Sequence, residues 1–315
     1  MSDIFGESIE VVKSLGEIFQ GPAGCYHESF PLFSTPVPRR SRVDRKPCHS
    51  GFAEAGVPVL AGSRRGLSVG SACGVAVDMR DRESLARAMR GIATVALVIP
   101  DVVDMESIGL NVVSAAQAAG VNRLFWFSSF GAKPENQARF SRRHPVIDEA
   151  VRASGIPYAI LRPNFFMQDF AAFYADTIRT TDTIFLPLGD ARVSHLDLRD
   201  LAEAAVAVLK DDRQLNRTFD LSGPEALHTS EVAEQIGSVT GRPIRYQRIT
   251  AAAMEASLRD AGMDPWFAEG LAELYACVRD SGLASEVTDT TEQLLGRKPT
   301  SFRQFAVDYR SAFLD

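Results

Sequence analysis

From residue 52 onward, short and almost continuously apolar runs alternate with segments that have the apolar spacing of helices. Residues 94–99 and 123–128 are the clearest of these runs, and Pro100 stops the first. A strand that is apolar on both sides must be buried on both faces, which happens when helices cover a parallel sheet. Alternation of strand and helix favours parallel order with right-handed crossovers. The sequence therefore predicts an α/β fold built on a doubly wound parallel sheet.

The remaining elements follow from the same spacing and from helix-capping residues. Asp81 and Thr229 are predicted to cap the helices that follow them. Further strands are predicted at residues 57–61, 74–77, 158–161, 218–221 and 244–249, with a short one inside 183–193. Helices are predicted at residues 81–89, 108–119, 146–153, 198–209, 229–239 and 251–277. Sheets of this kind bind ligands at the carboxyl ends of their strands, so chemistry is expected in the loops there.

Composition and charge argue against several classes of function. The chain of 315 residues has 40 acidic and 34 basic side chains, a net charge of −6, which does not favour a nucleic-acid-binding surface. Its longest apolar runs are far too short to span a membrane. Its four cysteines lack the spacing of a zinc site or a disulfide framework, and no metal is expected. The N-terminus does not resemble a signal peptide, so a cytoplasmic protein is expected.

Residues 1–50 differ from the rest of the chain. They hold five of the 16 prolines, two of the four cysteines and a run of basic residues between Arg39 and Lys46. Residues 9–19 have the spacing of a short amphipathic helix. Residues 21–50 show neither the helical nor the strand period, and we interpret them as a loop or a poorly ordered segment.

Two residue pairs at predicted strand ends are suited to a ligand. Ser128 and Ser129 end a buried strand, where their hydroxyls can donate to a ligand or orient a water. They can equally well satisfy backbone groups of the turn. Phe165 and Phe166 follow the next strand, and a flat aromatic wall there suits a planar ring, although such a pair is more often plain core.

Longer motifs resemble a known family. The stretches GVNRLFWFSSFGAKPE and HPVIDEAVRASGIPYAILRPNFFMQDF, which begin at Gly120 and His144, are similar to the NmrA-like branch of the atypical short-chain dehydrogenase/reductases. The motifs GDARVSHLDLRDLAEAAVAVL and GRKPTSFRQFAVDY extend the resemblance over about residues 52–315. This branch includes NAD(P)H-dependent quinone, azo and triphenylmethane dye reductases, and the fungal ergot-alkaloid dehydrogenases that act on agroclavine or festuclavine look similar.

The resemblance implies a Rossmann-type sheet with a smaller C-terminal α+β substrate-binding region. Residues 51–163 together with 194–221 would bind the dinucleotide. Residues 164–193 together with 222–315 would bind the substrate. Residues 1–50 would be an atypical segment that replaces the expected first strand and its glycine-rich loop.

The resemblance also implies which residues would contact the cofactor. Arg64, assisted by Arg65, would meet the adenosine ribose, and an arginine there without an acidic residue ending the strand favours NADP(H) over NAD(H). The alternative is a solvated basic turn. The other positions placed along the dinucleotide are Asp78, Met79, Val98, Ile99, Pro100, Phe127, Ser128, Ser129, His144, Pro163, Asn164, Phe165 and Phe166.

The catalytic acid is not identified by sequence, and His144 is its one candidate. His144 lies near the position where many relatives carry a lysine or histidine close to the nicotinamide ribose, and its ordinary pKa is near neutrality. It can equally be an exposed residue at a helix start. Asp197 lies on the substrate side in the family layout, with either a structural or a functional role. The candidates for lining the substrate pocket, with core packing as the alternative, are Phe166, Phe170, Tyr174, His195 and Trp266.

Two features of the wider family are missing. No tyrosine lies between Gly120 and Pro157, so the Tyr-x-x-x-Lys pair of typical short-chain dehydrogenases is absent. The chemistry implied is direct hydride transfer to an acceptor that is already electrophilic. A GATGxxG turn after a first strand is absent too. That turn would hold the pyrophosphate at a helix N-terminus.

Three explanations of the missing turn remain open. The N-terminal segment has diverged and binds dinucleotide weakly or not at all; it rebuilds the strand and loop with unusual residues; or the reading frame or start site is shifted over residues 6–50. A strand from residues 1–50, lying between those predicted at 57–61 and 94–99 with free backbone amides at its end, would distinguish between these explanations.

The function implied is an NAD(P)H-dependent oxidoreductase that transfers hydride to a small, planar, electron-poor acceptor. Quinones, azo or triphenylmethane dyes and iminium compounds are such acceptors. One alternative is a non-catalytic NADP(H)-binding redox sensor or regulatory protein that acts through a protein partner, and another is a cofactor-free remnant. The expected partner is a small molecule, not a nucleic acid or a membrane, and the chain is expected to be a monomer or a homodimer.

Overall fold

The computed structural model describes residues 32–34, 59–66 and 73–314, which contain a seven-stranded sheet. Its strand order is β3-β2-β1-β4-β5-β6-β9. The strands are β1 (Leu32–Ser34), β2 (Val59–Ser63), β3 (Cys73–Ala76), β4 (Thr94–Leu97), β5 (Arg123–Phe127), β6 (Tyr158–Pro163) and β9 (Arg217–Leu221). From β2 the chain builds outward to β3, and from β4 it builds the other way through β5, β6 and β9. This reversal confirms the doubly wound α/β fold, and such reversals are where these folds bind ligands.

β1 corrects the interpretation of residues 21–50 as a loop at residues 32–34, and the rest of that segment lies outside the described residues. It lies between β2 and β4 and runs antiparallel to both, with Leu32 opposite Ala61 and Ala96, whereas all other neighbouring pairs of this sheet are parallel. A strand of three residues is too short to show a period in the sequence. Because β1 is antiparallel, its first residue, and not its last, lies towards the carboxyl ends of its neighbours. The helix predicted at residues 9–19 lies outside the described residues.

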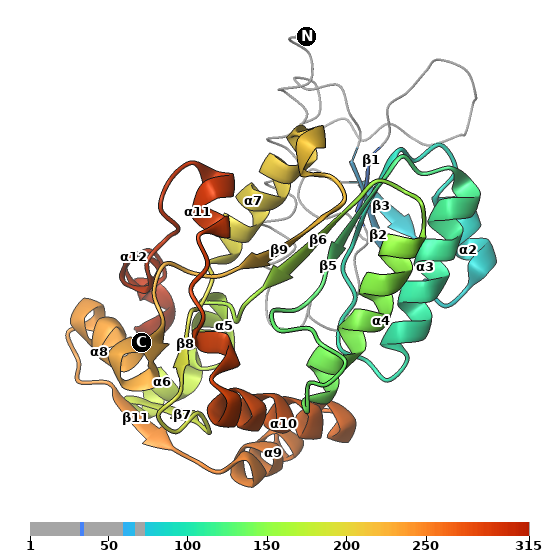
Figure 1. Cartoon of the computed structure of the whole chain (residues 1–315). Helices are drawn as coiled ribbons and strands as arrows, with labels where there is room; N and C mark the ends of the chain where they lie inside the picture. Colours follow the sequence, from blue (N-terminus) through green and yellow to red (C-terminus); the bar gives the residue numbers. More distant parts are fainter. Residues whose placement is uncertain (1–31, 35–58, 67–72, 315) are drawn as a thin grey trace.

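Helices cover both faces of this sheet (Figure 1). On one face lie α2 (Arg82–Ala88), α3 (Met105–Ala119) and α4 (Arg139–Ala153); on the other lie α7 (Leu198–Lys210), which the 3-10 helix η2 (Asp212–Gln214) follows, and α11 (Thr290–Leu295). Strand β5 shows why its sequence is continuously apolar. Leu124 and Trp126 pack into the core beneath α2, α3 and α4, while Phe125 and Phe127 pack into the core beneath α7.

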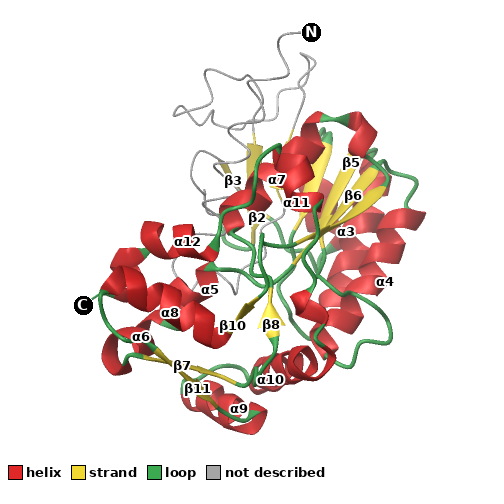
Figure 2. Cartoon of the chain, turned by 60° about the vertical axis from the view of Figure 1, so that its left-hand side comes forward, coloured by secondary structure: helices red, strands yellow, loops and turns green. Residues whose placement is uncertain are grey.

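The second half of the chain adds two small sheets and a third core (Figure 2). β7 (Thr183–Leu186) pairs in parallel with β11 (Arg245–Arg248), and β8 (Arg192–Val193) pairs antiparallel with β10 (Leu227–His228). Around them lie α5 (Gln168–Ala172), α6 (Ala175–Thr181), α8 (Thr229–Thr240), α9 (Ala251–Asp260), α10 (Pro265–Ser281) and α12 (Phe302–Asp308), with the 3-10 helices η3 (Leu283–Ser285) and η4 (Arg310–Phe313). Phe170, Phe302 and Phe305 are among the buried side chains of this core.

Two predicted helices differ most from the structure in their bounds, and one predicted cap is wrong. The helix expected at 146–153 begins at residue 139 and continues through Pro145. The proline removes one backbone hydrogen bond of the helix but does not end it. The helix expected at 251–277 is broken by Gly262, whose φ is 82°, and restarts at Pro265. Thr229 is the first residue of α8, and His228 caps the helix by accepting from the Ser230 amide. Asp81 caps α2 as predicted.

Candidate active site

A small pocket lies directly after the carboxyl end of β6. Its cavity is only about 10 Å³, roughly the space of one water molecule. Four of the five residues predicted to contact substrate line it, which are Phe166, Phe170, Tyr174 and His195. The other lining residues are Phe165, Asp169, Leu186, Leu188, Val193 and Tyr275. A ligand the size of an aromatic ring enters only if these aromatic side chains turn aside.

Polar groups occupy one part of this mainly apolar pocket. The hydroxyls of Tyr174 and Tyr275 are 2.6 Å apart. Burial lowers the pKa of His195 to about 3, so its imidazole is neutral, and its Nδ1 has no hydrogen-bond partner. Burial raises the pKa of Asp169 to about 7, although a backbone hydrogen bond from Phe166 opposes the shift. At neutral pH this carboxyl is therefore partly protonated.

The raised pKa of Asp169 predicts a pH dependence of stability. An unfolded aspartate titrates near 3.8, so the folded state holds this proton more tightly. The resulting stabilisation is complete below about pH 4 and is lost as the pH rises through about 7. Between pH 5 and pH 8 the wild type should lose on the order of 2 kcal/mol more than Asp169→Asn does. Thermal unfolding across this range measures the difference, with the exposed Asp176→Asn as the control; parallel curves for all three proteins would contradict it.

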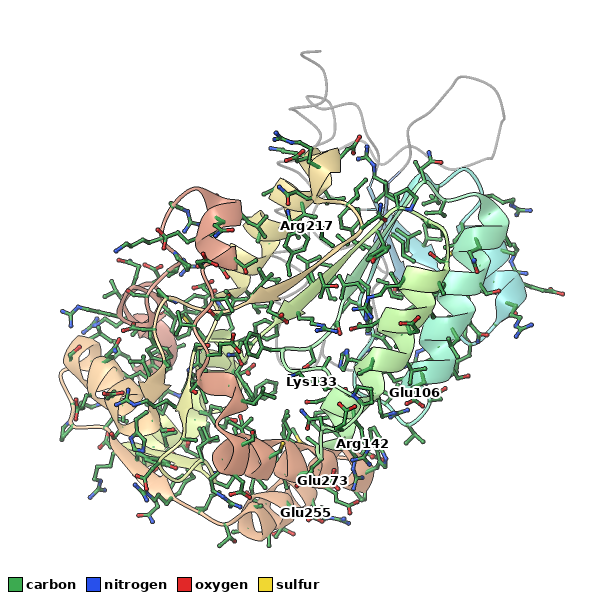
Figure 3. The ribbon with its side chains drawn as sticks, in the orientation of Figure 1. Glu106, Lys133, Arg142, Arg217, Glu255 and Glu273 are labelled. Carbon is green, nitrogen blue, oxygen red and sulfur yellow. The ribbon has the colours of Figure 1, made fainter. Side chains whose placement is uncertain are left out.

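Trp266 is not part of this pocket. It lies on α10, with its ring centroid 5.5 Å from that of Phe140 and 5.3 Å from the guanidinium carbon of Arg143 on α4. Beside it, Arg139 donates to Glu273 Oε1 at 2.6 Å, which lowers the pKa of that carboxyl. Figure 3 shows Glu273 where α10 meets α4. Trp266 therefore contributes to the contact between these two helices, in keeping with the packing alternative.

At the carboxyl end of β2, a tight turn presents the two predicted phosphate-binding arginines. Arg64 and Arg65 are both exposed at its tip. Gly66 closes the turn with a φ of 63°, and an added Cβ would lie 2.9 Å from the Ala76 amide nitrogen. Asp78 is half-buried and accepts from the Arg80 amide, whereas Met79 is buried in the core.

The ends of β4 and β5 contribute the next predicted positions. Val98 and Pro100 are half-buried, and Ile99 is buried in the core. Phe127 is buried in the core under α7. The hydroxyl of Ser128 is buried without a hydrogen-bond partner, whereas Ser129 donates to the Phe130 carbonyl at 3.4 Å. Buried hydroxyls usually have a hydrogen-bond partner. A hydroxyl without one, at the carboxyl end of a strand, is suited to contact a ligand.

His144 is not the exposed helix-start residue of the alternative interpretation. It lies inside α4, 6% exposed, with its ring stacked on Trp126 at 5.5 Å. Burial lowers its pKa to about 4, although the charge of Asp148 opposes the shift. Its Nε2 lies 3.9 Å from a carboxylate oxygen of Asp101, and its Nδ1 has no partner. A neutral imidazole is a poor proton donor near neutral pH, so His144 is better suited to hydrogen bonding than to acid catalysis.

Asn164 and Asp197 have structural roles. The Asn164 amide group donates to Ser194 Oγ at 2.7 Å and to the Ala284 carbonyl at 2.9 Å, and its oxygen accepts from the Phe165 amide. These bonds tie the end of β6, which includes Pro163, to the strand and 3-10 helix beside it. Asp197 caps α7 by accepting from the Arg199 amide.

Sequence reasoning missed three titratable residues of this region. Asp101 follows Pro100 directly, and burial raises its pKa to about 7. Asp169 lies within the recognised motif but was not distinguished from its neighbours. Tyr275 occupies the apolar stripe of a helix together with Ala268, Ala272 and Val278, which favours core packing and hides its polar contact.

Within the described ranges, no group of three or more histidine, cysteine, aspartate or glutamate side chains is arranged to hold a metal ion. No helix in the described part of the chain is both long and apolar enough to traverse a membrane.

Comparison with known proteins identifies relatives over most of the chain. An NAD(P)H azoreductase of Xenophilus azovorans is 33% identical over 236 residues, which is 75% of this chain and 82% of that protein. Agroclavine dehydrogenase of Claviceps fusiformis is 29% identical over 73% of this chain and 79% of its own. Among solved structures, the Citrobacter sp. triphenylmethane reductase complexed with NADP(H) is 25% identical, with a TM-score of 0.65, over 73% of this chain and 81% of that one. The model of the NmrA-like family matches residues 43–306. The chain therefore belongs to the NmrA-like family.

Proposed function

We propose that this chain is an NADPH-dependent reductase of small, planar, electron-poor molecules. The observation that carries the proposal is the position of the aromatic pocket, which begins at Phe165 beside the carboxyl ends of the strands. Its lining is mainly aromatic and aliphatic, with four polar side chains among ten residues, as in pockets for small aromatic molecules. The azoreductase and the triphenylmethane reductase, whose names state such acceptors and nicotinamide cofactors, support the same chemistry.

The described residues fit parts of a dinucleotide at the reversal of the sheet. Arg64 is exposed on the turn after β2 and suits a 2′-phosphate, and the unpartnered hydroxyl of Ser128 suits a ribose or amide group. The cofactor would supply the hydride, and the protein would orient it towards the pocket. β1 does not supply the usual glycine-rich turn at this edge, because it begins there and ends at the opposite edge.

The regulatory alternative has less support. The azoreductase and the agroclavine dehydrogenase, which match 75% and 73% of this chain, are named as a reductase and a dehydrogenase. The division into a dinucleotide-binding region and a substrate-binding region belongs to this proposal, with the third core around Phe170 as the substrate side.

The proposal is tested by adding NADPH and a panel of acceptors to the purified protein and following the loss of NADPH absorbance. The panel contains a quinone, an azo dye and a cationic triphenylmethane dye. We expect NADPH to be oxidised in the presence of at least one class of acceptor. Binding of NADPH by calorimetry without turnover on any acceptor would favour the sensor instead, and absence of binding would favour the cofactor-free remnant.

A further inference from the structure

Two tyrosines meet in the pocket although the chain lacks the tyrosine of the typical dehydrogenase pair. Tyr174 precedes α6 and Tyr275 lies on α10, 101 residues apart in sequence, yet their hydroxyl oxygens are 2.6 Å apart. Tyr275 is only 5% exposed, and its ring packs against Phe165 with centroids 5.4 Å apart. The pair therefore joins two segments that are distant in sequence, and it adjoins the predicted nicotinamide position.

A pair of hydroxyls at this distance always keeps one proton that is not shared between them. Either tyrosine can donate to the other, and the oxygen that accepts still has its own O–H group. Most of the side chains around it are apolar, such as Phe166 and Leu186, so a ligand atom in the pocket is a natural acceptor for that O–H. The other polar lining side chains are Asp169 and His195.

We propose that the Tyr174–Tyr275 pair is the proton donor for acceptors whose reduction consumes a proton, and that Asp169 restores the proton. The proposal rests on the reductase function proposed above. With an azo compound, hydride from NADPH adds to one nitrogen, the π electron pair of the N=N bond moves to the other nitrogen, and that nitrogen takes the phenolic proton. The products are a hydrazo compound and NADP⁺. The phenolate left behind takes a proton from the Asp169 carboxyl, which is reprotonated by water.

The electrostatics of the pocket agree with these roles. Burial raises the pKa of both tyrosines, and the nearby charge of Asp169 raises them further, so each phenol keeps its proton until the acceptor becomes basic. The partly protonated state of Asp169 near neutral pH allows it to return a proton. His195 has a lowered pKa and no proton to give as an acid.

The experiment compares two acceptors that differ in their need for a proton. Reduction of an azo dye requires hydride and a proton, whereas a cationic triphenylmethane dye is neutralised by hydride alone. The readout is the ratio of the azo rate to the cationic-dye rate, which cancels losses of cofactor binding or folding. The ratio should fall by about 10-fold in Tyr174→Phe and in Tyr275→Phe, since one hydroxyl remains, and by about 100-fold or more in the double variant.

Matched measurements keep the outcome decisive. Tyr158→Phe, at the start of β6 on the opposite edge of the sheet, should leave the ratio unchanged. Asp169→Asn should lower the steady-state ratio but not the first turnover. In wild type, heavy water should slow the azo reaction more than the cationic-dye reaction. An unchanged ratio in the tyrosine variants, with wild-type turnover intact, overturns the tyrosine proposal alone. Absence of NADPH oxidation with every acceptor overturns the reductase function together with it.

Discussion

Replacing Arg162 with alanine is expected to lower the free energy of unfolding by about 3–5 kcal/mol, because it leaves a buried carboxylate without its counter-charge. Asp148 is 0% exposed inside α4. Arg162, on β6, donates to its Oδ2 at 2.5 Å, and the Trp126 indole donates to its Oδ1 at 2.8 Å. Without the arginine, the buried carboxylate of Asp148 loses its nearest counter-charge. Urea unfolding at neutral pH measures the loss.

The environment of Asp148 also provides the control for that measurement. Arg152 lies 3.8 Å from the same carboxylate oxygen, but it is 35% exposed and one helical turn away. Arg152→Ala should cost less than about 1 kcal/mol, as exposed pairs usually do. Equal losses in the two variants would show that the interior pair is not what stabilises this region.

The sheet could be predicted because burial on both faces leaves a direct signal in the sequence. Every described strand of the main sheet except β1 was expected, since runs such as that of β5 must be apolar towards both layers. β1 was not expected, because three residues give no period and antiparallel pairing at the centre follows no local pattern. The interior pair of Asp148 and Arg162 was equally hidden, since it joins a helix to a strand and each residue alone looks like a surface charge.

The pocket was predicted in part, and the residues that were predicted differ in a physical way from those that were not. Phe166, Phe170, Tyr174 and His195 were proposed from a family resemblance, and the structure brings them together. Trp266 has the same aromatic character but lies on the α4 side of α10, and composition alone does not tell which side of a helix meets a ligand. Asp169, for its part, gains its raised pKa from burial, which a sequence does not show.

Replacing Arg64 with alanine is expected to weaken NADPH binding by about 10- to 100-fold, the equivalent of one charge-assisted contact of about 1.5–3 kcal/mol. NADH binding should change little, because NADH has no 2′-phosphate. Arg64 is exposed on the turn after β2, so the stability of the variant should match that of the wild type. Calorimetric titration with each dinucleotide measures both affinities.

The control for Arg64 is Arg87→Ala, which removes an exposed arginine from the last turn of α2 and should alter neither affinity. The comparison of the two affinities matters more than either value alone, because NADPH and NADH differ only in the 2′-phosphate that Arg64 is proposed to contact. If the 2′-phosphate contact carries a large share of the binding, wild type should bind NADPH far more tightly than NADH, and Arg64→Ala should abolish that preference. A preference that survives the substitution would place the selective contact outside this turn.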